Sequence, residues 1–173
     1  MKFDPSIVQT AFQSPLGPMT LAATHAGLAG VWFSGQRHLP PELATVGSWP
    51  QNARHPILIK TTQQLTQYFA GERQVFDLPL DLSGGTAFQQ AVWRALQVIQ
   101  AGQTTSYGNI SKTINNPAAV RAVGAAVGRN PISIIVPCHR VLGADGSLTG
   151  YAGGLERKTA LLKIEGAADL RLF

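Results

Sequence analysis

"SYGNISKTINNPAAVRAVGAAV", residues 106–127, predicts two helices joined by a tight turn. Asn115 and Asn116 interrupt the first helical pattern, and Pro117 suits the first position of the second helix. Two helices in this arrangement form a helix-turn-helix, whose second helix contacts a groove of DNA. That second helix is Ala, Val and Gly almost throughout, with Arg121 as its single charge. Such small residues allow close approach of nucleic acid, although Ala-rich helices are more often buried against a core.

The sequence on either side of this pair is also helical in pattern. Residues 86–101 carry apolar side chains at helical spacing and stop at Gly102. Residues 154–166 predict a last helix. The second half of the chain is therefore expected to be mainly helical.

The first half predicts antiparallel strands followed by a helix. Three strand-like stretches are separated by turn residues, at 6–14, 19–23 and 28–33. A loop follows, and Pro56 then suits the start of a helix. The glycines of "SGG", residues 83–85, predict a domain boundary. We expect an α+β protein with a small antiparallel sheet and helix in residues 1–85 and a second domain in residues 86–173.

Composition and charge narrow the class of protein. The chain has 173 residues, of which 45% are hydrophobic and 13% charged, so it is globular. Its net charge is +5, and all of the excess lies in residues 86–173, which carry nine basic side chains against four acidic. This asymmetry suggests a nucleic-acid partner, although a merely solvated basic surface explains it equally well.

The expected setting is the cytoplasm, or the nucleus if the source has one. The first residues lack the apolar stretch of a signal peptide, and no apolar run approaches the roughly 18 residues of a membrane span. One cysteine cannot form an internal disulfide. One cysteine and four scattered histidines give no zinc-like spacing, and "LSGGTAF" (82–88) lacks the end of a phosphate loop. We expect no metal and no cofactor.

Cys138 is the single cysteine, and it follows the apolar run "IIV". A lone cysteine is more often a small buried hydrophobe than a nucleophile. Three neighbours favour a nucleophile. His139 can take a thiol proton, Arg140 adds charge that favours thiolate, and Pro137 fixes the backbone.

The geometry of this pair is not settled by the sequence. Adjacent side chains on an extended strand point to opposite faces, so contact between Cys138 and His139 needs a bend or a bridging water. A carboxylate is also wanted to orient the imidazole. Glu165, near the end of the last helix, is a candidate, and a solvated helix end is the alternative.

A family resemblance adds to these patterns. Residues 130–166, "NPISIIVPCHRVLGADGSLTGYAGGLERKTALLKIEG", closely resemble the active-site region of O6-alkylguanine-DNA alkyltransferases, the methylated-DNA–protein-cysteine methyltransferases. "PCHRV" is the family's core motif, and "TSYGNIS", "AAVRAVGAA" and "GRNP" match in order and spacing. The resemblance implies an RNase H-like N-terminal domain in residues 1–85. It implies a DNA-binding and active-site domain with a winged helix-turn-helix in residues 86–173. Some relatives bind zinc in the N-terminal domain, and this chain lacks the ligands.

The resemblance implies DNA repair by direct reversal. The alkyl group of O6-alkylguanine in double-stranded DNA would move irreversibly to Cys138, once per molecule and without a cofactor. O4-alkylthymine is a further candidate substrate. The second helix of the pair would enter the minor groove, and the damaged base would flip out of the stack. The protein is expected to be a monomer, with cooperative binding on DNA left open and no membrane association.

The resemblance also implies roles for single residues. Cys138 would attack as thiolate, His139 would deprotonate it through a water, and Glu165 would hold His139. Asn130 would brace the turn before the cysteine. Tyr107 would press on a phosphate and help protonate the leaving guanine.

Two further sets of residues follow from the same resemblance. Arg121 would enter the duplex and fill the space of the flipped base. The implied DNA contacts are Tyr107, Gly108, Asn116, Ala119, Arg121, Ala122 and Gly124. The implied substrate pocket is formed by Tyr151, Ala152, Val141 and Lys158. Some relatives carry serine where Ala152 stands, and the contact there is expected through the backbone.

Three alternatives stay open at this point. A damage-binding relative without activity would keep the groove helix, but such relatives replace the cysteine that is present here. A thiol hydrolase would turn over an ester or amide and need no DNA. A helix-turn-helix regulator would bind a specific sequence and form no covalent product.

Overall fold

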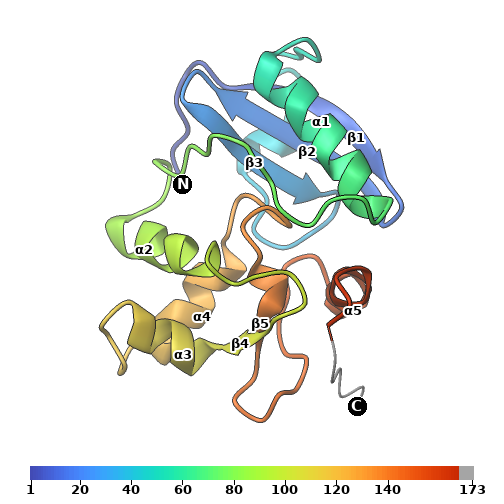
Figure 1. Cartoon of the computed structure of the whole chain (residues 1–173). Coiled ribbons are helices and arrows are strands. Elements are labelled where there is room, and N and C mark those ends of the chain that lie inside the picture. Colours follow the sequence, from blue (N-terminus) through green and yellow to red (C-terminus); the bar gives the residue numbers. More distant parts are fainter. Residues whose placement is uncertain (168–173) are drawn as a thin grey trace. The chain divides into compact units, whose positions relative to one another are not determined.

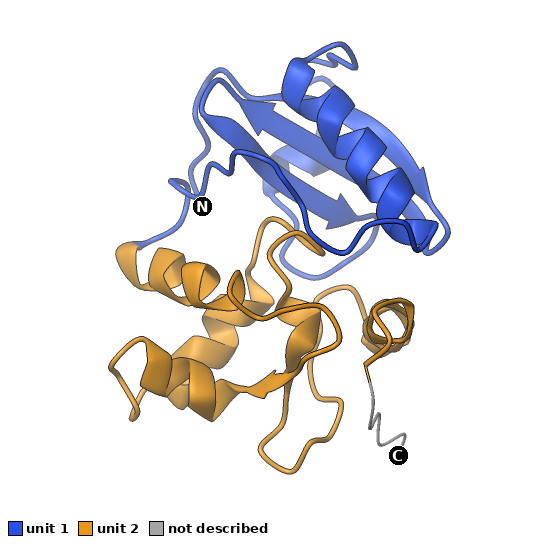
Figure 2. Cartoon of the chain, in the orientation of Figure 1, with its two compact units in different colours: residues 1–86 blue, residues 87–173 orange. Residues whose placement is uncertain are grey.

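The computed structural model describes residues 1–167 of the chain (Figure 1). The chain divides into two compact units, residues 1–86 and 87–173 (Figure 2). No helix within the described residues is long and apolar enough to cross a membrane.

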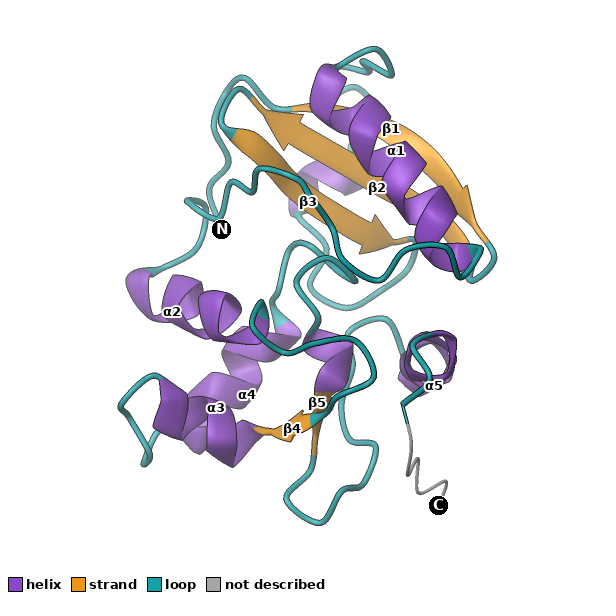
Figure 3. Ribbon diagram, viewed as in Figure 1, coloured by secondary structure: helices purple, strands orange, loops and turns teal. Residues whose placement is uncertain are grey.

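The first unit is a three-stranded antiparallel sheet with one α-helix packed on it (Figure 3). Its elements are β1 (Val8–Ser14), β2 (Gly17–Thr24), β3 (Gly27–Phe33), the 3-10 helix η1 (Pro41–Ala44) and α1 (Pro56–Phe69). The three predicted strands and the helix starting at Pro56 are confirmed. Leu58, Leu65 and Tyr68 form much of the buried face of α1. A separate aromatic cluster forms around Trp32 and Trp49.

The second unit is mainly helical, as predicted. Its elements are α2 (Ala87–Leu96), β4 (Thr105–Ser106), α3 (Tyr107–Thr113), α4 (Val120–Gly128), the 3-10 helix η2 (Cys138–Arg140), β5 (Val141–Leu142) and α5 (Leu155–Ile164). The helices α3 and α4 form the helix-turn-helix. β4 and β5 pair in parallel, with Thr105 opposite Val141 and Ser106 opposite Leu142. This pairing places the start of α3 beside the segment that follows Arg140.

Two helix boundaries differ from the prediction. The second helix of the pair, α4, begins at Val120 and not at Pro117. Residues 116–119 form a turn instead, because the Asn116 N–H donates to Ser111 O and the Ala119 N–H donates to Asn116 O, at 2.9 and 3.0 Å. Asn115 has the left-handed φ of 58° that ends α3.

The helix α2 also differs, because it ends at Leu96 and not near Gly102. Tight turns follow it, in which the N–H of Ile99 donates to Leu96 O at 3.1 Å. Trp93, which the apolar stripe did not single out, is fully buried. Its Nε1 donates to Ala126 O at 2.8 Å and so ties α2 to α4.

Candidate active site

Cys138 lies at the first position of a short 3-10 turn, not on an extended strand. Its side chain is buried, at 5% exposure. Pro137 precedes the turn with φ −83° and ψ 64°, and the N–H of Arg140 donates to Pro137 O at 3.0 Å. Because the backbone turns here, neighbouring side chains need not point to opposite faces. The turn therefore supplies the bend that is required for His139 to act on Cys138.

Asn130 clasps the loop that leads to the cysteine. It is buried, its Nδ2 donates to Val136 O at 2.7 Å, and its Oδ1 accepts from the Ile132 N–H at 3.0 Å. The loop is strained at Ile134, a buried β-branched residue with φ 73°. The clasp by Asn130 stabilises this conformation, so the position of Cys138 depends on it.

The surroundings of the Cys138 thiol shift its pKa in opposite directions. Burial raises the pKa of Cys138, while the hydrogen bond from Asn130 and the charge of Lys158 lower it. Burial is the largest influence, so the pKa lies above its ordinary value. A thiol in this state needs a base to become a nucleophile.

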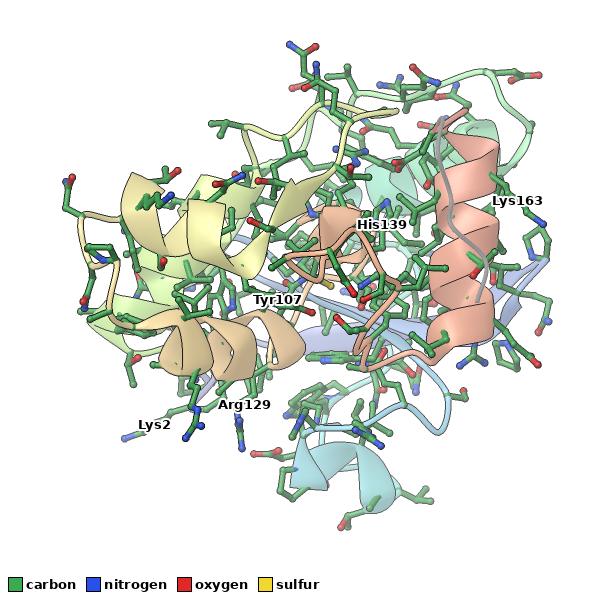
Figure 4. All side chains as sticks on the ribbon, turned by 90° about the horizontal axis from the view of Figure 1, so that it is seen from below. Lys2, Tyr107, Arg129, His139 and Lys163 are labelled. Atoms are coloured by element: carbon green, nitrogen blue, oxygen red, sulfur yellow. The ribbon has the colours of Figure 1, made fainter. Side chains whose placement is uncertain are left out.

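His139 and Glu165 meet across 26 positions of sequence. His139 Nε2 lies 2.7 Å from Glu165 Oε1, and both side chains are buried. Figure 4 shows His139 between its turn and α5, whereas Lys163 points outward from that helix. Glu165 is 4% exposed, so the alternative of a solvated helix end is wrong.

The charge of Glu165 determines which imidazole nitrogen is the acceptor. Burial raises the pKa of Glu165, but hydrogen bonds from His139 and Arg140 outweigh it and lower the pKa to about 2. The carboxylate is thus ionised at neutral pH and only accepts, so His139 Nε2 carries the hydrogen. In neutral His139 the acceptor is Nδ1, which is buried and has no hydrogen-bond partner within residues 1–167. Burial lowers the pKa of His139, which favours this neutral form.

Arg140 does not act as the sequence suggested. Its Nε donates to Glu165 Oε2 at 2.9 Å and its Nη2 donates to Glu165 Oε1 at 2.8 Å. The guanidinium therefore neutralises Glu165, and the cation that lowers the thiol pKa is Lys158. The sequence predicted that Arg140 acts on the thiol and did not reveal its pairing with Glu165. Buried arginines are rarely unpaired, so an arginine within an apolar segment was a signal for a carboxylate partner.

Tyr107 and Lys158 converge on one carbonyl group. The Tyr107 hydroxyl donates to Thr149 O at 3.1 Å. Lys158 Nζ is buried and donates to the carbonyls of Val141, Thr149 and Gly150 at 2.6, 3.0 and 3.0 Å. Lys158 thus holds main chain near the predicted pocket. Burial lowers the pKa of Lys158 to about 8 and raises the pKa of Tyr107.

The remaining residues of the predicted substrate pocket are Tyr151, Ala152 and Val141. Tyr151 and Ala152 are half-buried and Val141 is buried. Burial raises the pKa values of both Tyr107 and Tyr151, and the charge of Cys138 adds to the effect.

The predicted DNA contacts lie on α3, α4 and the turn between them. Asn116, Arg121 and Ala122 are exposed, and the other predicted contacts, Tyr107, Gly108, Ala119 and Gly124, are half-buried. A Cβ added at Gly124 would lie 3.9 Å from Tyr107 Cδ1, so α4 packs beside the tyrosine. Arg129, at the end of α4, also points outward (Figure 4).

Comparison with known families gives matches over both units. The model of the 6-O-methylguanine DNA methyltransferase ribonuclease-like domain matches residues 7–82. The model of the DNA binding domain of the same methyltransferases matches residues 87–167.

Curated proteins resemble the chain over nearly its whole length. A methylated-DNA–protein-cysteine methyltransferase of Methanosarcina acetivorans is 49% identical over 156 residues, which cover 90% of this chain and 96% of the relative. One of Mycolicibacterium paratuberculosis is 48% identical over 163 residues, covering 92% and 94%.

Solved structures also resemble the chain over nearly its whole length. The crystal structure of Mycobacterium tuberculosis O6-methylguanine methyltransferase has a TM-score of 0.80 and 46% identity, covering 94% of this chain and 96% of that one. The structure of OGT of the same organism in complex with DNA has a TM-score of 0.79 and 47% identity, covering 90% and 91%.

Proposed function

The chain belongs to the methylated-DNA–protein-cysteine methyltransferase family and repairs DNA by direct reversal, moving an alkyl group to a cysteine, and we propose that this cysteine is Cys138. One observation carries the proposal: the chain has a single cysteine, and it adjoins a buried histidine–carboxylate pair. We propose O6-alkylguanine in double-stranded DNA as the substrate, with O4-alkylthymine as a second substrate to be assayed.

The reaction begins with removal of the thiol proton. Glu165 holds His139 through Nε2, so Nδ1 takes the proton of Cys138, directly or through water. The thiolate then attacks the alkyl carbon. A carbon–sulfur bond forms and the bond from that carbon to O6 of guanine breaks.

The leaving guanine needs one proton, and the site holds one. Tyr107 keeps its hydroxyl hydrogen at neutral pH, because the ordinary pKa of tyrosine is 10.0 and burial raises the pKa of Tyr107 further. It donates that hydrogen to the guanine and is restored from the proton on His139. Guanine thus gains one proton for the one that the thiol loses, and no external acid, base or cofactor enters the balance. Asn130 keeps Cys138 in place through its hold on Val136 O.

The same proposal covers the approach to DNA. The exposed small residues of α4 allow it to enter the minor groove, and Arg121, in the first turn of α4, occupies the space of the flipped base. Tyr151, Ala152, Val141 and the backbone held by Lys158 line the guanine site. All of these residues lie in the second unit, which supports assigning residues 86–173 as the DNA-binding and active-site domain and residues 1–85 as a separate N-terminal domain.

We further propose that the protein acts as a monomer in the cytoplasm, or in the nucleus of a nucleated source. Cooperative binding along DNA is measurable as a sigmoidal dependence of binding on protein concentration.

Excess duplex containing labelled O6-methylguanine tests the proposed chemistry. A thioether has no carbonyl for water to attack, so product should stop at one equivalent of active protein. The protein mass should rise by one methylene, on the peptide containing Cys138. Product beyond one equivalent would support a thiol hydrolase instead. DNA binding without any mass change would support a damage-binding protein or a regulator.

A further inference from the structure

Arg140 has a partner at each of three guanidinium nitrogens. Nε and Nη2 donate to the two carboxylate oxygens of Glu165, and Nη1 donates to the backbone carbonyl of Ile99. The side chain is 7% exposed. The guanidinium of Arg140 therefore lies in the interior of the second unit and is not placed to contact a DNA phosphate.

Arg140 and His139 share one oxygen atom of Glu165. Oε1 accepts from His139 Nε2 at 2.7 Å and from Arg140 Nη2 at 2.8 Å. A planar guanidinium bound at two points fixes the plane of a carboxylate, which a single ammonium cannot do. The orientation of the oxygen that holds His139 is thus set by Arg140. The 3-10 turn makes this arrangement available, because it lets two consecutive side chains reach the same group on α5.

Arg140 also balances the charge beside His139. Burial is the main cause that lowers the pKa of His139, and the charged groups that affect it are Lys158 on α5, Glu165 at the end of that helix and the adjacent Arg140. Cys138 precedes it on the same turn. With Arg140 present, the buried carboxylate is already paired. Without it, the negative charge of Glu165 would be uncompensated, and His139 is the group in contact with it that could compensate by keeping a proton.

We propose that Arg140 is a positioning residue for alkyl transfer. It fixes the Glu165 carboxylate that orients His139, and it neutralises that carboxylate so that His139 stays uncharged and able to accept the thiol proton. This inference rests on the proposed roles of Cys138, His139 and Glu165.

The test follows the rate of reaction with free O6-benzylguanine as a function of pH, so that DNA binding plays no part. In Arg140→Met, the acid limb of the rate–pH profile should move to higher pH, because loss of the positive charge raises the pKa of His139. The rate at neutral pH should fall roughly tenfold or more, by analogy with the loss seen when the partner that orients a metal-bound histidine is removed. In Arg140→Lys the limb should stay near the parent position while the rate falls, because the charge remains and the two-point contact is lost.

A double variant separates positioning from a merely structural role. Arg140→Met combined with Glu165→Gln removes both charges, so the acid limb should move back to lower pH than in Arg140→Met alone. The matched control is Arg94→Met. Arg94 is exposed on α2 and donates to Gln90 Oε1 at 3.0 Å, so rate and profile should match the parent.

Specific outcomes would overturn the inference. If Arg140→Met keeps the parent pH profile and loses rate only in proportion to its unfolded fraction, Arg140 is structural. If Arg140→Met does not fold, an Arg140→Lys variant with the parent rate would refute the two-point positioning. If the parent itself forms no adduct on Cys138, the proposed function fails, which is a distinct result.

Discussion

Replacing Glu165 with glutamine should change how the stability of the protein depends on pH. The pKa of Glu165 is about 2 in the folded protein against an ordinary value of 4.5: burial raises it, and the stronger hydrogen bonds from His139 and Arg140 lower it. Because the pKa is lower when folded, the ionised carboxylate stabilises the folded state above pH 4.5. That contribution is lost as pH falls through about 2. The difference of about 2.5 pKa units corresponds to roughly 3 kcal/mol of unfolding free energy.

The variant should lose the most unfolding free energy, relative to the parent, at neutral pH. There it leaves the buried guanidinium of Arg140 without its counter-ion, a loss that costs about 3–5 kcal/mol. The variant also has no carboxylate at this position to protonate in acid. The unfolding free energies of parent and variant should therefore converge as the pH is lowered.

Urea unfolding of both proteins, repeated from neutral pH into the acid range, measures this convergence. Glu156→Gln is the matched control, because Glu156 lies exposed in the first turn of the same helix. An exposed carboxylate contributes little, so this control should parallel the parent. Parallel curves for the parent and Glu165→Gln over the whole range would refute the stabilising role of the ionised carboxylate.

Two further predictions concern the reaction itself. Cys138→Ser should abolish alkyl transfer, because a serine hydroxyl is far harder to ionise than a thiol, and should leave DNA binding largely intact, because α4 is unchanged. If mass spectrometry shows that the variant is still alkylated near the parent rate, Cys138 is not the acceptor. Arg121→Ala should slow repair of duplex DNA more than reaction with free O6-benzylguanine, because the arginine is needed only when a base leaves the stack; equal loss on both substrates would indicate a structural arginine.

Local patterns determined the elements of the fold. Alternating and helical spacing of apolar residues, together with Pro56 and Asn115, predicted the sheet, the helices and the helix-turn-helix, whereas Gly102 did not mark the end of α2, which is Leu96. They did so because side-chain periodicity reports directly which residues face a core. They did not place the start of α4, because backbone hydrogen bonds of Ser111 and Asn116 compete with helix formation at Pro117.

The sequence also identified the nucleophile candidate, because the chain contains one cysteine and a histidine follows it. It could not decide whether that histidine has a carboxylate. The contact of His139 and Arg140 with Glu165 spans 25 to 26 positions and depends on the turn at Cys138 and on the return of the chain into α5. Lys158 holds part of that return through three backbone carbonyls, which carry no sequence signal. Only the tertiary structure decided these contacts, because side-chain patterns encode burial along an element and not the partner met across a loop.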